Sequence, residues 1–512
     1  MKSFIKIFIV NLIAALFLFG CGIKELRNYE EFHDYSKPGS KLIRLPVVIV
    51  PGIKGSLLKR GDKEFWGKSY RVAFLHTFDE LQFPIKMQLN DYFNDSFGKF
   101  YNTKNVRDGG IMEKYWIALP FLNILDVSIY NNIGKVLEKS GGYSLNNDLF
   151  MFSYDWRLDN RISAAHLAWE VEKYQKLFLN YLLDKICEGN VNEFEKCKDK
   201  LKLKKLMTDD DHIKVNLIAH SMGGLVARYY IQMLGGEDNV NKLIMLGTPN
   251  QGAMDSFKAI AEGEFPESIL HFYKKKSTRP IIFSWPSAYQ LLPRYASCLK
   301  KGNSNYNKNL KDWGLCDSYY IILDDTESDK VINNWVSHNL VPESGFDSVD
   351  TLEVKKKFLK EQLISAAKFH NAINAEFDEK YEERKLKMIK SFSEAASIDV
   401  KVEKKFIDHQ AKTPFILFGG HCEPTLKYAY ITEKENSVEQ LEFDNPQKNK
   451  DKNKTYTMGD GRVPIVSLRL PTRENPSDFQ FLLCEGHANL VSNKTFQYNL
   501  LRELLWQTSY IK

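Results

Sequence analysis

One stretch in the middle of the chain constrains the fold more than any other. Residues 215–220 (VNLIAH) form a largely apolar run, Ser221 follows, and the chain continues directly into an amphipathic, helix-forming segment that reaches Tyr230. This order predicts a buried strand, a sharp turn at the serine and then a helix. A serine on such a tight turn needs small residues two positions before and after it, and Ala219 and Gly223 meet that need.

Ser221 is therefore the candidate nucleophile of an enzyme that uses a serine. The helix that begins near Met222 directs its first amides at the site, so the Met222 N–H is a candidate donor to an oxyanion. The second candidate donor is the Ile53 N–H, because an apolar strand at 45–50 ends there in a Pro-Gly turn. Either segment alone is also compatible with an ordinary turn beside a strand, so the identification needs catalytic partners elsewhere in the chain.

Two late segments supply such partners. Asp460 lies in the loop 458–464 (MGDGRVP), and His487 follows the apolar run 479–484. The order serine, acid, histidine is the chain order of one known family of catalytic triads, and we expect each member at the carboxyl end of a core strand. His487 is the candidate base, and Asp460 is the candidate acid that orients its imidazole.

Alternatives exist for both partners. An Asp-Gly turn is common in loops, so Asp460 could have a purely structural role. His220 lies next to the serine, but the residue beside a serine on such a turn is directed away from its hydroxyl. His421 is a weaker alternative base.

Three segments together resemble a known enzyme family. Residues 46–58, 142–158 and 215–230 are similar, in that order, to the lecithin:cholesterol acyltransferase family, which includes lysosomal phospholipase A and plant and bacterial acyltransferase-like lipases. The resemblance implies an α/β-hydrolase fold, with a mostly parallel central sheet and helices on both faces. It also implies that acyl groups are moved from phospholipids to water or to an alcohol, through Ser221, Asp460 and His487.

Two insertions are expected around the site. Residues 59–102 are unusually aromatic, which indicates either a lid that contacts lipid or a segment that covers the core. Within it, Trp66 has a place broadly similar to that of a substrate-contacting lid tryptophan of the family. Residues 253–410 are predicted to form a largely helical cap whose apolar walls hold the acyl chain. Asp155 and Arg157 are predicted to pair beneath the pocket as scaffolding.

The N-terminus has the pattern of an export signal. Residues 1–20 carry two lysines followed by an apolar run, and LFGC at 18–21 resembles a bacterial lipobox. We therefore expect cleavage before Cys21, lipid attachment to its sulfur, and a tether at 22–40. The result would be a membrane-anchored lipoprotein of a bacterial cell envelope. An uncleaved anchor and a plain secretory signal are the alternatives.

Six cysteines remain after Cys21, which permits three disulfides in an exported protein. Six unpaired buried thiols are the alternative. Closeness in sequence favours two of the pairs, and the remaining two cysteines lie near the ends of late strands, where a disulfide could brace the active site. The pairs considered are Cys187 with Cys197, Cys298 with Cys316, and Cys422 with Cys484.

Composition sets outer limits on the function. The chain of 512 residues is 43% hydrophobic, enough for a large core, and we expect residues 41–512 to form a single globular domain with insertions. Its net charge of +6 is spread along the chain, so a nucleic-acid partner is not indicated. The expected partners are a lipid ester and a membrane surface, with no cofactor or metal. A carboxylesterase or neutral-lipid lipase and a non-enzymatic surface lipoprotein are the alternatives, and the oligomeric state is open.

Overall fold

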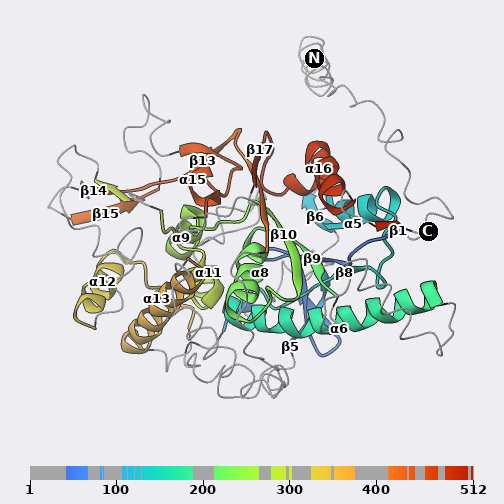
Figure 1. The fold of residues 1–512 in the computed structure, drawn as a ribbon. Helices are drawn as coiled ribbons and strands as arrows, with labels where there is room; N and C mark the ends of the chain where they lie inside the picture. The colour runs from blue at the N-terminus through green and yellow to red at the C-terminus, as the bar shows by residue number, and fades with distance from the viewer. Residues whose placement is uncertain are drawn as a thin grey trace, which may run out of the picture.

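A six-stranded sheet forms the centre of the computed structural model (Figure 1). All five of its strand pairings are parallel, and several of its strands are continuous apolar runs, as expected for strands that are buried on both faces. The order of the strands across the sheet is β8 (Leu149–Met151), β2 (Val47–Val50), β9 (Val215–His220), β10 (Val240–Leu246), β12 (Phe415–Gly420) and β17 (Phe479–Leu483).

The structure describes residues 42–66, 81–83, 85, 106–111, 114–119, 122–128, 130–187, 213–263, 278–295, 299–301, 325–346, 351–374, 413–434, 438–443, 456–470, 479–505 and 509–510. The expected signal at 1–20, Cys21 and the tether at 22–40 lie outside them. In the part of the chain that is described, no helix combines the length and hydropathy needed to cross a membrane.

Helices cover both faces of the sheet, and the hydrophobic core consists of two clusters, one on each face. One face packs against α6 (Asn160–Cys187) and α8 (Met222–Met233), and the other packs against α5 (Tyr130–Lys139) and α16 (Lys494–Leu505), as Figure 1 shows. Alternate residues of a strand point to opposite faces, so Val48 of β2 belongs to the first cluster and Ile49 to the second.

The strand order reverses direction between β2 and β9. From β2 the chain passes to β8 on one side, then returns to β9 on the other side of β2 and continues outward to β17. The carboxyl ends of β2 and β9 therefore lie side by side where the order switches, and ligands of open α/β sheets bind at such a switch point. The turn after β2 and the serine after β9 both lie there.

The described part of the segment 59–102 contributes several side chains to the core. Strand β3 (Ser56–Arg60) pairs with β4 (Lys63–Trp66) and with β5 (Val106–Ile111) in an antiparallel sheet. Phe65 and Phe83 are buried in the main cluster. These parts cover the core, and the remainder of the segment lies outside the described residues.

The described part of the segment 253–410 is mostly helical and packs beside the sheet. It contacts the first helix layer, for example where Phe369 stacks on Tyr229 of α8 with ring centroids 5.5 Å apart. Its elements are α9 (Met254–Glu262), α11 (Pro286–Gln290), β11 (Leu299–Lys301), α12 (Asp325–Ser337) and α13 (Leu352–Asn374).

Asp460 reaches the site differently from the sequence prediction, which placed it after a core strand. It follows β16 (Tyr456–Gly459), which pairs with β13 (Glu423–Leu426) in a separate two-stranded sheet beyond the end of β12. The sequence around Asp460 does not show to which sheet the preceding strand belongs, because a strand of the central sheet and a strand of a small separate sheet both end in a turn.

The remaining elements are β1 (Leu42–Ile43), β6 (Lys114–Leu119), β7 (Leu122–Ser128), β14 (Ala429–Lys434), β15 (Val438–Glu442), α15 (Ile465–Leu468), η7 (Leu490–Ser492) and β18 (Ser509–Tyr510).

Candidate active site

Ser221 occupies a strained turn between β9 and α8. Its φ of 53° and ψ of −128° lie where a residue other than glycine is rarely found, and its N–H donates to the Leu246 carbonyl at 2.8 Å. A Cβ at Gly223 would collide with the Pro51 carbonyl, so the turn requires a residue without a side chain there. Ala219 is fully buried under the turn. These are the small neighbours on which the sequence argument depends.

The three predicted catalytic side chains meet at this turn. His487 Nε2 lies 2.9 Å from Ser221 Oγ, and His487 Nδ1 lies 2.7 Å from Asp460 Oδ2. Asp460 is 2% exposed, and the His487 side chain is 16% exposed. The imidazole therefore stands between a buried carboxylate and a hydroxyl at the edge of the solvent.

Backbone amides hold the Asp460 carboxylate in this orientation. Its Oδ1 accepts the N–H groups of Arg462 at 2.9 Å and Val463 at 2.7 Å, and its carbonyl accepts the N–H of His487 at 2.7 Å. Burial by itself would raise the pKa of Asp460. The attraction and hydrogen bond of His487 and the two amides outweigh it, so this pKa lies below the usual carboxyl value.

The turn after β2 is anchored at three of its polar backbone groups. The Ile53 N–H between them has no hydrogen-bond partner among the described residues, so it is available to a ligand. The anchors are Tyr154 Oη to the Pro51 carbonyl at 2.8 Å, the Gly52 N–H to Tyr130 Oη at 2.8 Å, and Trp66 Nε1 to the Lys54 carbonyl at 3.1 Å.

The Met222 amide is the other predicted donor. Met222 is the first residue of α8, and the first amides of a helix have no carbonyl of that helix to bond. The amide of Ile53 is brought beside Ser221 because Gly52 lies against the serine: a Cβ at Gly52 would be 2.7 Å from Ser221 Cβ. The geometry thus groups the two predicted oxyanion donors with the predicted nucleophile.

Trp66, on β4, lies beside the turn after β2. This turn, residues 51–54, is called the oxyanion turn below because it carries the predicted donor, the Ile53 amide. Its indole N–H donates to Lys54, and its ring meets the ring of Trp156 edge to face at a centroid distance of 5.3 Å. The side chain is partly buried. This tryptophan therefore braces the turn that carries the Ile53 amide.

The two alternative histidines bond away from the serine. His220 is buried and bonds to Tyr130 Oη through Nδ1 at 3.0 Å and to the His487 carbonyl through Nε2 at 3.1 Å. Burial, with a further contribution from His487, lowers its pKa to about 3. His421 Nδ1 bonds to the Leu483 carbonyl at 2.9 Å. His487 is thus the histidine that bonds to the serine.

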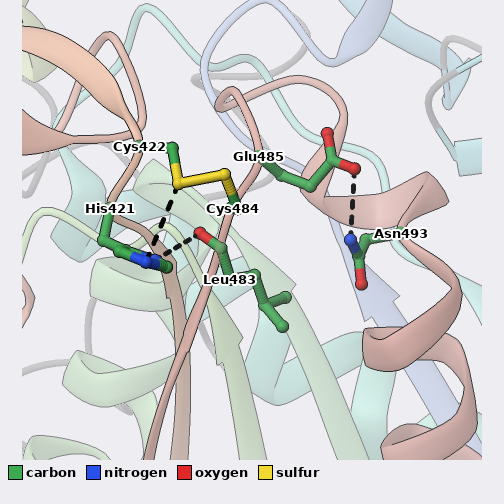
Figure 2. The surroundings of a disulfide bond; sticks show 6 residues. All are labelled: His421, Cys422, Leu483, Cys484, Glu485 and Asn493. Carbon is green, nitrogen blue, oxygen red and sulfur yellow. Dashed lines mark hydrogen bonds between the residues drawn. A yellow bond between two sulfur atoms is a disulfide. The ribbon is translucent and has the colours of Figure 1, made fainter. Parts of the chain in front are cut away.

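A disulfide joins Cys422 and Cys484, which follow the neighbouring strands β12 and β17 (Figure 2). Cys422 and Cys484 are both exposed to solvent, and the disulfide is the third of the pairings considered from the sequence. The bond lies beside the loops that carry the acid and the histidine, since Glu423 forms a β-bridge with Asp460. The remaining cysteines lie outside the described residues, apart from the backbone of Cys187.

Asp155 and Arg157 form a buried ion pair, as the sequence suggested. Arg157 Nε bonds to Asp155 Oδ1 at 2.9 Å, and a terminal nitrogen bonds to Oδ2 at 2.7 Å. The guanidinium also lies 4.4 Å from the ring centroid of Phe83. The pairing is confirmed, and its scaffolding role stays a prediction.

Sequence reasoning missed several residues that shape the site. Tyr130 and Tyr154 anchor the oxyanion turn, yet nothing in their local sequence distinguishes them from core tyrosines. Gly247 has a φ of +55°, and a Cβ there would lie 2.9 Å from His487 Nδ1. Its position in the turn after an apolar strand predicted a role in shape, but not this contact with His487. Among the described residues no group of His, Cys, Asp and Glu is arranged to hold a metal ion.

Two curated proteins of Arabidopsis thaliana are similar to this chain. Lecithin-cholesterol acyltransferase-like 4 is 24% identical over 269 residues, which is 48% of this chain and 42% of that protein. Phospholipase A(1) LCAT3 is 23% identical over 391 residues, which is 68% of this chain and 77% of that protein. The chain thus spans less than half the length of the first relative and about three quarters of the second.

Solved structures align over most of the chain at low similarity. A chain of the Tle4–Tli4 complex covers 90% of this chain and 98% of its own length, with 15% identity and a TM-score of 0.47. Scores at this level add nothing to the fold assignment, which rests on the parallel sheet, its strand order and the turn at Ser221.

A family model supplies the decisive comparison. The model described as lecithin:cholesterol acyltransferase matches residues 187–482, which is more than half of the chain and includes Ser221 and Asp460. Together with the parallel sheet and the serine turn, this match establishes that the chain is a member of the lecithin:cholesterol acyltransferase family, with an α/β-hydrolase fold.

Proposed function

We propose that this protein is a serine-dependent lipid acyl hydrolase or O-acyltransferase that cleaves acyl esters of phospholipids. The observation that carries the proposal is the continuous hydrogen-bonded series Ser221–His487–Asp460, with contacts of 2.9 and 2.7 Å, beside the Ile53 amide. Membership of the family and a relative named as a phospholipase A(1) support lipid esters as the substrate class.

In the first half of the reaction, His487 Nε2 removes the proton of Ser221 as Oγ attacks the ester carbonyl carbon. The carbonyl π electrons move to oxygen, and the resulting oxyanion accepts hydrogen bonds from the Ile53 and Met222 amides. Asp460 keeps the proton on Nδ1 before the attack and stabilises the imidazolium afterwards. The imidazolium then protonates the leaving alcohol, the C–O bond breaks, and an acyl-serine remains.

In the second half, water or an alcohol attacks the acyl-serine. His487 again takes the proton of the attacking hydroxyl, a second oxyanion forms at the same donors, and the proton returns to Ser221 as the free acid or the new ester leaves. Trp66 is partly exposed beside these donors, and we assign it a contact with the substrate in addition to its bond to Lys54.

Attachment to a membrane is the second part of the proposal. LFGC at 18–21 supports lipidation of Cys21, and acyl chains contribute about 0.8 kcal/mol for each buried CH₂, so several chains would hold the enzyme at its substrate. Replacement Cys21→Ser should move the protein from the membrane to the soluble fraction. Continued membrane attachment of this variant would instead support an uncleaved anchor.

The reaction is tested on phospholipid vesicles with and without an alcohol acceptor, by following released fatty acid and new ester. Ser221→Ala should lower kcat by about 10⁴-fold or more, while Ser337→Ala, at an exposed serine of α12, serves as a matched control. Ser221-dependent cleavage of short soluble esters with none of vesicles would favour the carboxylesterase alternative. Retained vesicle cleavage by Ser221→Ala would refute the nucleophile.

A further inference from the structure

A series of hydrogen bonds connects the oxyanion turn to the loop that carries His487. The Gly52 N–H donates to Tyr130 Oη at 2.8 Å, Tyr130 Oη lies 3.0 Å from His220 Nδ1, and His220 Nε2 lies 3.1 Å from the His487 carbonyl. Tyr130 and His220 are both buried. Neither side chain is hydrogen-bonded to Ser221, so the mechanism above does not use them.

The direction of every bond in this series follows from its two ends. The His487 carbonyl can only accept, so the neutral His220 ring carries its proton on Nε2 and leaves Nδ1 as an acceptor. Tyr130 must then donate its single proton to His220 Nδ1. The Gly52 N–H donates to the oxygen of the same Tyr130 hydroxyl. The series is therefore fully satisfied in one arrangement of protons.

We propose that Tyr130 and His220 form a positioning relay that fixes the oxyanion turn and the His487 loop relative to each other. This inference rests on the proposed function, because both loops must hold their groups at set distances from Ser221. The turn follows β2 and the loop follows β17, and three strands of the sheet separate these two. The relay joins the loops through side chains, whereas β2 and β17 are not neighbours in the sheet and share no strand hydrogen bonds.

Two further contacts suit the residues to this role. Asn132 of α5, two residues after Tyr130, donates to Ser492 Oγ at 2.8 Å, which ties the helix of the tyrosine to the segment after His487. The ring centroids of His220 and His487 are 4.9 Å apart, so a charged His220 would oppose the imidazolium that forms on His487 during catalysis. Among the described residues, Asp460 also acts on His220 electrostatically, and it bonds to His487. A neutral relay leaves that ion pair undisturbed.

The relay is tested with three variants of the full chain. Tyr130→Phe removes the hydroxyl, and His220→Gln keeps an amide near the Nε2 position but removes the Nδ1 acceptor. Tyr295→Phe is the control, because it deletes the hydroxyl of a different buried tyrosine, which donates to the Lys427 carbonyl at 3.0 Å. Ester hydrolysis gives kcat and KM, and thermal unfolding measures stability.

We expect Tyr130→Phe and His220→Gln each to lower kcat by about 10- to 100-fold with little change in KM, as a lost hydrogen bond and an unsatisfied buried partner would do. Tyr295→Phe should lose comparable stability and keep its kcat. The double variant should be little worse than the poorer single variant, because both changes interrupt one series. Losses that multiply, or a Tyr130→Phe kcat equal to that of Tyr295→Phe, would overturn the relay.

A second readout does not depend on activity. NMR of the ¹⁵N-histidine-labelled chain, with His220→Gln to assign the signal, should show His220 neutral with its proton on Nε2 at pH 7 and a changed tautomer balance in Tyr130→Phe. A proton on Nδ1 in the parent chain would refute the relay. If the parent chain shows no Ser221-dependent hydrolysis, the proposed function fails, and this measurement still decides how the two loops are connected.

Discussion

A single methyl group at Gly247 should slow the proposed reaction without replacing any of the candidate catalytic residues. Gly247 follows β10 with a φ of +55°, and an added Cβ would lie 2.9 Å from His487 Nδ1 and 3.0 Å from Asp460 Oδ2. Ordinary contacts begin at 3.4 Å, so in Gly247→Ala each atom must retreat by 3.4 − 3.0 = 0.4 Å or slightly more. The methyl thus presses directly on the bond that orients the imidazole.

Two reference values set upper bounds on the size of the effect, since the displacement is smaller than about 1 Å and Asp460 is retained. A misplacement of 1 Å costs about 100-fold, and loss of the orienting acid costs about 10⁴-fold. We therefore expect Gly247→Ala to lower kcat by about 10- to 100-fold in ester hydrolysis. The left-handed backbone adds a loss of about 1–2 kcal/mol in the free energy of unfolding.

Gly61→Ala separates the two effects. Gly61 has a φ of +59°, and an added Cβ there meets nothing within 4 Å. It should therefore show the stability loss in urea unfolding with an unchanged kcat. Equal kcat values for the two variants would refute the reasoning, because they would show that the contact between Asp460 and His487 tolerates the displacement or does not limit the rate.

Three further predictions follow from the same contacts. Replacing Cys422 and Cys484 by serine opens a loop with a sequence separation of 62 and should lower the unfolding free energy by about 4 kcal/mol; a thermal unfolding curve that matches the parent chain would contradict this. Trp66→Phe keeps a ring against Trp156 but loses the bond to the Lys54 carbonyl, so kcat should fall by about 3- to 10-fold, and an unchanged kcat would show that the turn holds without it. Because the folded-state pKa of Asp460 is lowered, its stabilisation is complete above the ordinary carboxyl pKa and is lost as the pH falls through the folded value. The stability advantage over Asp460→Asn, measured by urea unfolding at pH 6 and pH 3, should therefore shrink at the lower pH, and a constant difference would exclude this coupling.

Most of the central sheet could be read from the sequence because its strands are buried on both faces. Runs such as VVIV in β2 and FILF in β12 contain no polar residue, so neither face of these strands is suited to solvent. The Asp460 loop was assigned to the right region but to the wrong kind of strand, since β16 pairs outside the central sheet. Pairing partners depend on distant segments, and a local pattern does not contain them.

The candidate triad was also accessible from the sequence, whereas its surroundings were not. Small residues around Ser221 and the chain order of the three side chains follow from local steric needs that the sequence records directly. Tyr130, Tyr154 and Gly247 serve the site through contacts with residues 78 to 240 positions away. Such contacts arise only when strands are arranged side by side.

The sequence by itself determined that a strand must end in a strained serine turn, because only that order of apolar, small and helix-forming residues satisfies the local backbone. It also limited the acid and the base to a few candidates. The tertiary structure alone decided which histidine bonds to Ser221, which backbone amide is left available, and which cysteines pair beside the site. These outcomes depend on distances across β2, β9, β12 and β17, and those distances exist only after the sheet has assembled.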